Sequence, residues 1–336
     1  MVIKSKERTI KQWLLFLSCI FLINTSFAKG FELKFKDNQK FKIVQFTDTH
    51  IKANNPESKA AITMINKVLD EENPDLVIFT GDVVTGNPVI HGWEMVTEPI
   101  IERDIPFAVV LGNHDDENEL SREEVANFVV KLHGNLFIPH TKGVDGFGNY
   151  VLPVKSSSGS ANAALLYCMD SNAYSTIEGI KGYGWFQESQ INWYRKESQK
   201  QKKENGRVLP ALAFFHIPLV EYTEAYKNEK HPPIGVRLEK ECSPEINSGM
   251  FTAMLESGDV MGTFVGHDHS NDYISYLHGI ALAYGRFSGG KTTYGELSNG
   301  ARVIELTENE RGFKTWIRTN QGEVLLPVDF PSDFDN

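Results

Sequence analysis

The feature that most constrains the fold is a set of short apolar runs that each stop abruptly at polar residues. These runs have the length of strands, and most are rich in Val, Ile, Leu or Phe. They span residues 41–46, 76–79, 107–111, 163–169, 209–215 and 260–265. Most are apolar throughout rather than alternating, which is typical of strands that are covered on both faces. Such strands predict a layered protein and exclude a disordered or fibrous chain.

Helical segments separate these runs. Residues 58–72 place apolar side chains on one stripe at helical spacing. Residues 121–132 open with a capping box, in which Ser121 and Glu124 cap the first turn reciprocally. Residues 187–202 and 245–257 also have helical character. The alternation of strands and helices predicts an α/β fold.

Beyond residue 271 the pattern changes to short strands with glycine turns. We expect antiparallel strands there that complete a second sheet. Because no linker divides the chain after residue 28, we predict a single domain over residues 29–336. Its motif core spans residues 41–285 and its C-terminal strands residues 286–328.

The first 28 residues have the features of a secretory signal sequence. A basic start precedes an apolar run at residues 13–23, and small residues follow at Ser26 and Ala28. The run is shorter than the roughly 20 residues of a spanning helix. We therefore expect export to the periplasm or the medium, with cleavage after Ala28. Lipid attachment at Cys19 is a weaker alternative.

Charge and cysteine content narrow the choice of partners. The formal net charge is −10, and loss of residues 1–28 would remove four basic residues and one acidic residue to leave −13. A chain this acidic has no general attraction for nucleic acid or for an anionic membrane. We expect neither of these partners and no obligate protein partner. Cys168 and Cys242 would remain, either as a disulfide or as two separate thiols.

Five of the apolar runs end in carboxylate, amide or imidazole side chains. Ligand sites form at the carboxyl ends of strands in α/β sheets, so these side chains can converge at one edge. Oxygen and nitrogen donors without sulfur suit Fe, Mn or Zn. The candidate metal ligands are Asp48, His50, Asp82, Asn113, His216, His267 and His269.

These seven donors exceed the needs of one octahedral ion, so we expect two ions that share a carboxylate. Two such ions hold the oxygens of a phosphoryl group and lower the pKa of a water molecule, which then attacks phosphorus as hydroxide. The departing oxygen needs a proton, for which His114 is the candidate, with Asp115 orienting its ring. We expect Asn113 and His114 to contact the substrate phosphate. The acidic run at residues 115–119 is interpreted as a solvated loop rather than a third metal site.

In order, residues 48–50, 81–82, 112–115, 216 and 266–269 resemble the five motif blocks of calcineurin-like metallophosphoesterases. The resemblance implies a four-layer α-β-β-α sandwich of two mixed β-sheets flanked by helices. It also implies a dinuclear centre of divalent or mixed-valence ions, with Asp82 bridging. One ion would be bound by Asp48, His50, Asp82 and His269, and the other by Asp82, Asn113, His216 and His267.

Residues 183–185, 247–251 and 266–272 are similar to the purple acid phosphatase-like subgroup of this family. True purple acid phosphatases have a metal-binding tyrosine shortly after the bridging aspartate. Here Thr85 stands at that place, and His50 supplies the ligand of the general family pattern. We therefore expect no purple tyrosinate absorption band.

The resemblance implies an exported metal-dependent hydrolase of phosphate esters. A small phosphomonoester is the first choice of substrate, because a negative chain repels long polyanions. A phosphodiester or a nucleotide is the alternative on the same centre. A metal- or phosphate-binding module without catalysis is the third hypothesis, although every candidate ligand and His114 are present.

Overall fold

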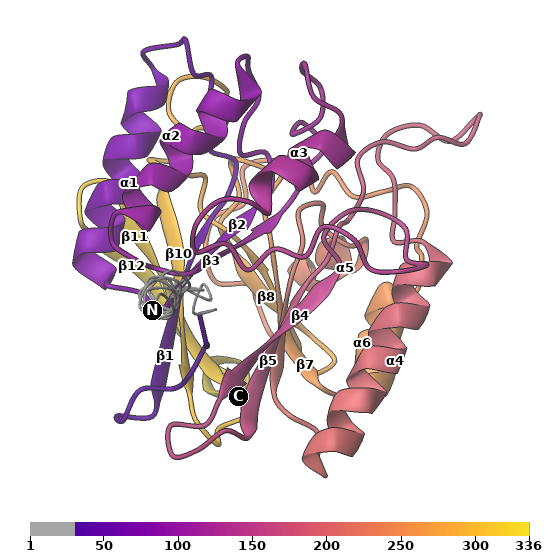
Figure 1. Ribbon diagram of the computed structural model, residues 1–336. Helices are drawn as coiled ribbons and strands as arrows, with labels where there is room; N and C mark the ends of the chain where they lie inside the picture. Colours follow the sequence, from indigo (N-terminus) through magenta and orange to yellow (C-terminus); the bar gives the residue numbers. More distant parts are fainter. Residues whose placement is uncertain (1–30, 336) are drawn as a thin grey trace, which may run out of the picture. The chain divides into compact units, whose positions relative to one another are not determined.

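The computed structural model describes residues 31–335, and its strands form two sheets that face each other (Figure 1). The predicted signal sequence at residues 1–28, with Cys19, lies outside this range. The first sheet contains β1 (Lys40–Phe46), β2 (Leu76–Thr80), β3 (Phe107–Val110), β10 (Gly300–Thr307), β11 (Phe313–Thr319) and β12 (Val324–Phe330). The second sheet contains β4 (Tyr150–Lys155), β5 (Asn162–Cys168), β6 (Ala211–Phe214), β7 (Val260–Val265), β8 (Ile274–Leu277) and β9 (Ile280–Tyr284).

Both sheets are mixed. The strand order is β12-β11-β10-β1-β2-β3 in the first and β4-β5-β6-β7-β9-β8 in the second. β1, β2 and β3 run parallel to one another, as do β5, β6, β7 and β9. The carboxyl ends of β1, β2 and β3 therefore lie at one edge of the first sheet, and those of β6 and β7 at one edge of the second.

Helices cover the outer faces of the two sheets (Figure 1). They are α1 (Ser58–Glu72), α2 (Val89–Ile101), α3 (Arg122–Val129), α4 (Glu188–Asn205), α5 (Glu221–Tyr226) and α6 (Met250–Ser257), with a 3-10 turn at Ser332–Phe334. α1 packs on α2 and on strands of the first sheet, while α4 packs on α6, which contacts β7. The expected four-layer α-β-β-α sandwich of two mixed sheets is thus confirmed.

Two apolar clusters hold these layers together. One joins the first sheet to α1 and to the inner face of the second sheet, where Phe79, Val303 and Phe264 are fully buried. The other lies between the second sheet and its helices and includes Tyr194 and Met254. Full burial of each such side chain contributes on the order of 2 kcal/mol, so the edge that bears the polar strand ends has a rigid base.

The C-terminal strands differ from the expectation. Only β8 and β9 join the second sheet, and β9 runs parallel to β7. β10, β11 and β12 extend the first sheet, where β10 pairs antiparallel with β1. Val303 of β10 lies opposite Val44 of β1, and both are fully buried. Most of β10 is buried, as befits a central strand, but its sequence does not reveal which of the two sheets it enters.

The helices largely follow the predicted pattern. α1 spans the predicted residues, and the capping box of Ser121 and Glu124 is present at α3. α2 has no counterpart among the predicted segments, since it contains Pro99. α6 begins later than expected because Gly249 has a φ of 83°, which a right-handed helix does not allow.

Cys168 is a buried free thiol and Cys242 is an exposed free thiol. Of the two alternatives left by the sequence, the structure therefore shows two separate thiols and not a disulfide.

Between residues 31 and 335, no helix has both the length and the apolar character needed to cross a bilayer.

Candidate metal centre

The polar strand ends meet at one edge of the two facing sheets. Asp48 and His50 follow β1, Asp82 follows β2, and His267 follows β7. All four have positive φ values, of 54°, 44°, 51° and 80° respectively. This left-handed conformation is uncommon outside glycine and costs on the order of 1–3 kcal/mol per residue. The chain therefore accepts local strain in order to turn these side chains toward a common point.

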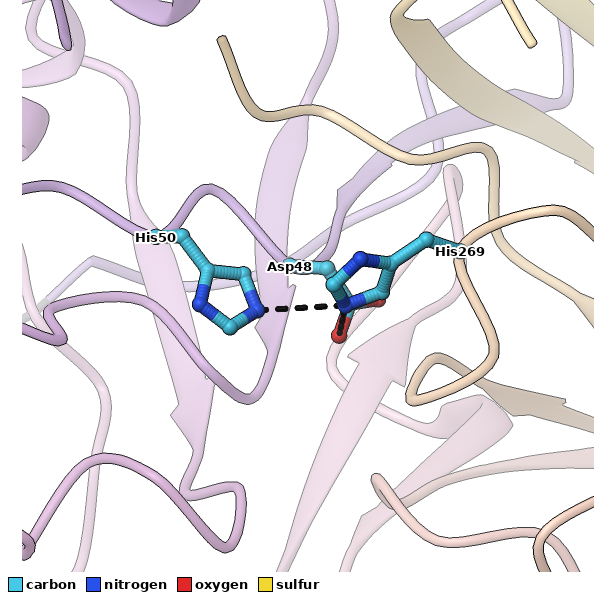
Figure 2. A group of neighbouring side chains, drawn as sticks. All are labelled: Asp48, His50 and His269. Carbon is cyan, nitrogen blue, oxygen red and sulfur yellow. Dashed lines mark hydrogen bonds and ion pairs between the residues drawn. The ribbon is translucent and has the colours of Figure 1, made fainter. Parts of the chain in front are cut away.

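The first group of donors contains Asp48, His50 and His269, whose candidate ligand atoms all lie within 4.8 Å of one another. His50 Nε2 is 3.1 Å from His269 Nε2, and the latter is 3.4 Å from Asp48 Oδ1. Figure 2 shows the two imidazoles pointing a nitrogen toward each other, with the Asp48 carboxylate beside His269. All three side chains are buried. We call this set the first donor group.

The second group contains Asp82, His216 and His267, again with ligand atoms within 4.8 Å of one another. His216 Nε2 is the central atom, at 3.1 Å from Asp82 Oδ2, 3.3 Å from His267 Nδ1 and 3.2 Å from Asn113 Oδ1. Asn113, from the loop after β3, therefore joins this set. We call these four residues the second donor group.

One carboxylate oxygen reaches both groups. Asp82 Oδ2 lies 3.1 Å from His216 Nε2 in the second group and 3.8 Å from His50 Nε2 in the first. The structure thus brings all seven predicted ligands together, with Asp82 at the boundary between the two donor groups. That these residues bind metal ions stays a prediction, and their geometry is compatible with it.

In two histidines, the hydrogen bond made by the outward-facing ring nitrogen determines the protonation of the inward-facing nitrogen. His216 Nδ1 donates to the carbonyl of Thr80 at 2.8 Å, and His269 Nδ1 donates to the carbonyl of Tyr294 at 2.8 Å. A carbonyl only accepts, so in the neutral rings Nε2 carries a lone pair that points into the centre. This is the arrangement in which imidazoles bind metal ions.

The electrostatics of the centre call for positive charge. Burial opposes protonation of His216, yet Asp82 and Asp48 raise its pKa to about 9. Burial lowers the pKa of His50 to about 4 and that of His267 to about 3. Burial opposes protonation of His269 as well, yet Asp48 raises its pKa. Without a cation, protonated imidazoles would therefore compensate the two buried carboxylates. Two metal ions would supply that charge, and the oxygen and nitrogen donors fit Fe, Mn or Zn.

A glycine is required where the loops cross. A Cβ atom built on Gly112 would lie 2.2 Å from Asp82 Oδ1, well inside van der Waals contact. The backbone after β3 can approach the Asp82 carboxylate only because this residue has no side chain. Because the backbone lies this close, the amide of His114 can donate a hydrogen bond to Asp82 Oδ1 at 2.8 Å.

Asp115 does not orient the ring of His114, which corrects one sequence expectation. Its buried carboxylate accepts hydrogen bonds from the backbone amides of Gly112 and Asp82, at 2.7 and 3.0 Å, and of Val83 and Val84, at 2.8 and 3.1 Å. Burial and the nearby Asp82 raise the pKa of Asp115 to about 6. The residue fastens the loop after β2 to the loop after β3, so it lies beneath the site rather than in it.

The ring of His114 is held by a residue that the sequence reasoning missed. His114 Nδ1 lies 2.5 Å from Glu117 Oε2. Glu117 belongs to the acidic run at residues 115–119, whose sequence predicts a solvated loop, and no local pattern distinguishes it from its neighbours. His114 itself lies beside the first donor group, with its ring centroid 5.7 Å from that of His50.

Three tyrosines contact members of the two donor groups. Tyr174 and Tyr183 are candidates for a pocket wall from the sequence, although core packing is the more common use of such aromatics, and Tyr294 has no sequence signal. The ring of Tyr294 stacks on His269 with a centroid distance of 4.2 Å. The ring of Tyr183 contacts His267 edge-on at 4.3 Å. Tyr174 accepts a hydrogen bond from Asn113 Nδ2 at 3.1 Å. Each of these three side chains thus contacts a member of one of the donor groups.

Comparison with known proteins assigns this site to a family. The calcineurin-like phosphoesterase family model matches residues 41–271, which include every member of both donor groups. The chain belongs to this family. The resemblance drawn from the five motif blocks is confirmed.

The calcineurin-like phosphoesterases most similar to this chain include purple acid phosphatase-like proteins. An Arabidopsis thaliana protein named probable inactive purple acid phosphatase 14 is 31% identical over 93% of this chain and 88% of its own length. Phosphatase DCR2 of Saccharomyces cerevisiae is 36% identical over 89% of this chain and 57% of the yeast protein. The structure of purple acid phosphatase PPD1 from yellow lupin has a TM-score of 0.57 at 13% identity, over 88% of this chain and 55% of the lupin chain, so it shares the fold.

Proposed function

We propose that this chain is a dinuclear metal-dependent phosphoesterase that hydrolyses small phosphate monoesters. The observation that carries the proposal is the position of Asp82 Oδ2, 3.1 Å from His216 Nε2 and 3.8 Å from His50 Nε2. A single carboxylate oxygen between two sets of nitrogen and oxygen donors is suited to hold two cations close together. Fe, Mn and Zn are the ions that this donor set favours.

When bound, such ions polarise the phosphoryl group and supply hydroxide at neutral pH. The side chains around them have separate tasks. Asn113, in the second donor group, and His114, beside the first, would contact the substrate phosphate. His114 Nδ1 is occupied by Glu117, so Nε2 is the nitrogen that remains to donate a proton to the departing oxygen. Proton transfer of this kind contributes on the order of 10²–10⁴-fold in rate.

The preference for small substrates over long polyanions is supported by charge. Two carboxylates lie beside residues that contact the donor groups. Glu117 is next to His114, and Glu239 accepts a hydrogen bond from the Tyr294 hydroxyl at 3.1 Å. With a formal net charge of −10 for the whole chain, they disfavour long polyanions. A phosphodiester or nucleotide remains the second candidate on the same centre.

A binding module without catalysis is the competing hypothesis, because the Arabidopsis relative described above is named probable inactive. Catalysis is favoured here because the seven donors and His114 stand together in one chain. Export and independence from nucleic acid, membrane and protein partners are part of the same proposal and rest on the sequence features given above. Intact mass of the protein from its exported fraction would test cleavage after Ala28.

The test begins with metal analysis of the purified protein, followed by assays with p-nitrophenyl phosphate and bis-p-nitrophenyl phosphate after loading with Mn, Zn or Fe. We expect two ions per chain and faster turnover of the monoester. Faster turnover of the diester would replace the proposed substrate class. Two bound ions without turnover of either ester would favour the binding module.

A further inference from the structure

Glu117 lies at the edge of the centre, and both of its carboxylate oxygens have partners. Oε2 is 2.5 Å from His114 Nδ1, and Oε1 accepts a hydrogen bond from the Tyr174 hydroxyl at 2.7 Å. The Glu117 side chain is 44% exposed, so this contact is not imposed by dense packing. A carboxylate held from two sides in this way has a defined orientation.

The hydrogen bonds continue to a member of the second donor group. Asn113 Nδ2 donates to the Tyr174 hydroxyl at 3.1 Å, and that hydroxyl donates onward to Glu117. Burial and the hydrogen bond to Glu117 raise the pKa of Tyr174 to about 12, so the phenol stays protonated as a donor. The Tyr174 ring stacks against Tyr183 at a centroid distance of 5.8 Å. The chain of contacts therefore runs from Asn113 through Tyr174 and Glu117 to the His114 ring.

This chain of contacts sets the proton positions of the imidazole. A carboxylate only accepts, so Glu117 requires a hydrogen on Nδ1 of His114 and leaves Nε2 to face a ligand. A ring held at Nδ1 in this way presents Nε2 in one direction, as transfer of a proton to a leaving oxygen requires. Asp115 cannot take over this task, because its carboxylate oxygens are bonded to backbone amides.

We propose that Glu117, held by Tyr174, is the positioning residue that fixes the His114 ring for protonation of the leaving oxygen. The inference rests on the proposed phosphoesterase function and deepens it. The proton moves from His114 Nε2 to the ester oxygen as the phosphorus–oxygen bond breaks, and the ring regains a proton from solvent. Glu117 touches neither phosphorus nor the leaving group.

A positioning role of this kind depends on the leaving group. p-Nitrophenolate is stable as an anion and departs with little help from an acid, whereas phenolate is more basic and needs the proton. Loss of Glu117 should therefore slow hydrolysis of phenyl phosphate much more than that of p-nitrophenyl phosphate. A residue with only a structural role would slow both esters alike.

The experiment compares Glu117→Gln with the matched control Glu119→Gln in the full-length, metal-loaded protein. Glu119 lies in the same loop, and its Oε1 accepts from the amide of Val89 at 2.8 Å, a bond that glutamine can keep. We expect kcat of Glu117→Gln on phenyl phosphate to fall about 10–100-fold, with a fall of less than about 3-fold on p-nitrophenyl phosphate. Tyr174→Phe should show the same selectivity with a smaller loss. The control should behave as wild type, and both variants should bind two ions.

A second measurement does not depend on turnover. In the zinc-loaded protein the short His114–Glu117 contact should give a strongly downfield proton resonance, which Glu117→Gln removes and Glu119→Gln keeps. Equal losses on the two esters, or a resonance unaffected by Glu117→Gln, would overturn the inference. If wild type hydrolyses neither ester, the proposed function fails, and the resonance alone decides whether Glu117 positions His114.

Discussion

The two donor groups lie side by side but differ in charge. The first contains the carboxylate of Asp48 and shares that of Asp82, whose Oδ2 is 3.8 Å from His50. The second has only the shared carboxylate of Asp82 and adds the neutral amide of Asn113. Because carboxylates attract a cation more strongly than an amide oxygen does, we expect the first group to bind its ion more tightly. The second group should exchange its ion more readily.

The two donor groups also share a feature, because each combines residues from both sheets. In each, the aspartate follows a strand of the first sheet, Asp48 after β1 and Asp82 after β2. In each, an imidazole follows β7 of the second sheet, His269 in the first group and His267 in the second. Every ion would therefore connect the two sheets, and its affinity depends on how the sheets face each other.

The most severe test of the comparison is Asp82→Asn. This substitution removes the only carboxylate that both groups share, so both should lose their ions. We expect turnover to fall by at least about 10³-fold, with metal content near zero by elemental analysis. Two ions still bound to the variant would show that Asp82 does not join the groups.

Asp48→Asn should separate the groups. It neutralises the carboxylate that belongs to the first group alone, while His216 and Asp82 of the second stay 3.1 Å apart. We expect the bound metal to fall from two ions to one and turnover to fall about 10²-fold. Titration of metal into the wild-type protein should show one tight and one weaker binding step. The variant should keep only the weaker step. If the tight step survives instead, the assignment of affinities is reversed.

Removal of the ions should make stability depend on pH. In the metal-free protein the pKa of His216 is about 9, against 6.5 for an ordinary histidine. Its proton therefore stabilises the fold fully below pH 6.5 and is lost as the pH rises through 9. The pKa of His269 is also raised, by Asp48 against the effect of burial, so its proton contributes in the same direction above pH 6.5. The lowered pKa values of His50 and His267 act below pH 6.5.

We expect the free energy of unfolding of metal-free protein to fall by about 1–3 kcal/mol between pH 6.5 and 9. The metal-loaded protein should lack this loss, because the ring nitrogen then holds an ion instead of a proton. Denaturant unfolding at both pH values measures the difference. The same slope with and without ions would mean that His216 is not a ligand.

The smallest effect is expected from Asn113→Asp, which gives the second donor group a second carboxylate and so removes its difference in charge from the first group. A carboxylate in place of the amide should tighten the weaker step about 3–10-fold in a metal titration, at pH 7. It should also lower turnover, because an aspartate repels the substrate phosphate and loses the donor to Tyr174. An unchanged weaker step would place Asn113 outside the second group.

Much of this centre was predictable because strand ends are local in sequence. Asp48, Asp82 and His216 each lie two residues beyond the end of a buried strand, so the converging side chains could be predicted from the apolar runs that precede them. Glu117 could not be found in this way, because an acidic side chain in an acidic run is usually solvated. Its partner Tyr174 lies 57 residues further along the chain, and only the folded loops bring the two together.

The fold was predictable to the same extent and for the same reason. The capping box at Ser121 is a local signal, and the helix starts there. α2 was missed because Pro99 interrupts a pattern that the packing against α1 nevertheless stabilises. The sheet that β10 joins depends on contact with β1, more than 250 residues earlier, and local periodicity does not contain that information.

The place of β10 beside β1 affects how the protein is made. The strand that delivers Asp48 and His50 acquires this neighbour only after residues 300–307 have been synthesised. His267 and His269 also emerge late, so the nascent chain carries an incomplete centre for most of its translation. We expect ion capture to be one of the last events in maturation, in whichever compartment the finished chain folds, and the metal supply of that compartment then selects the ions.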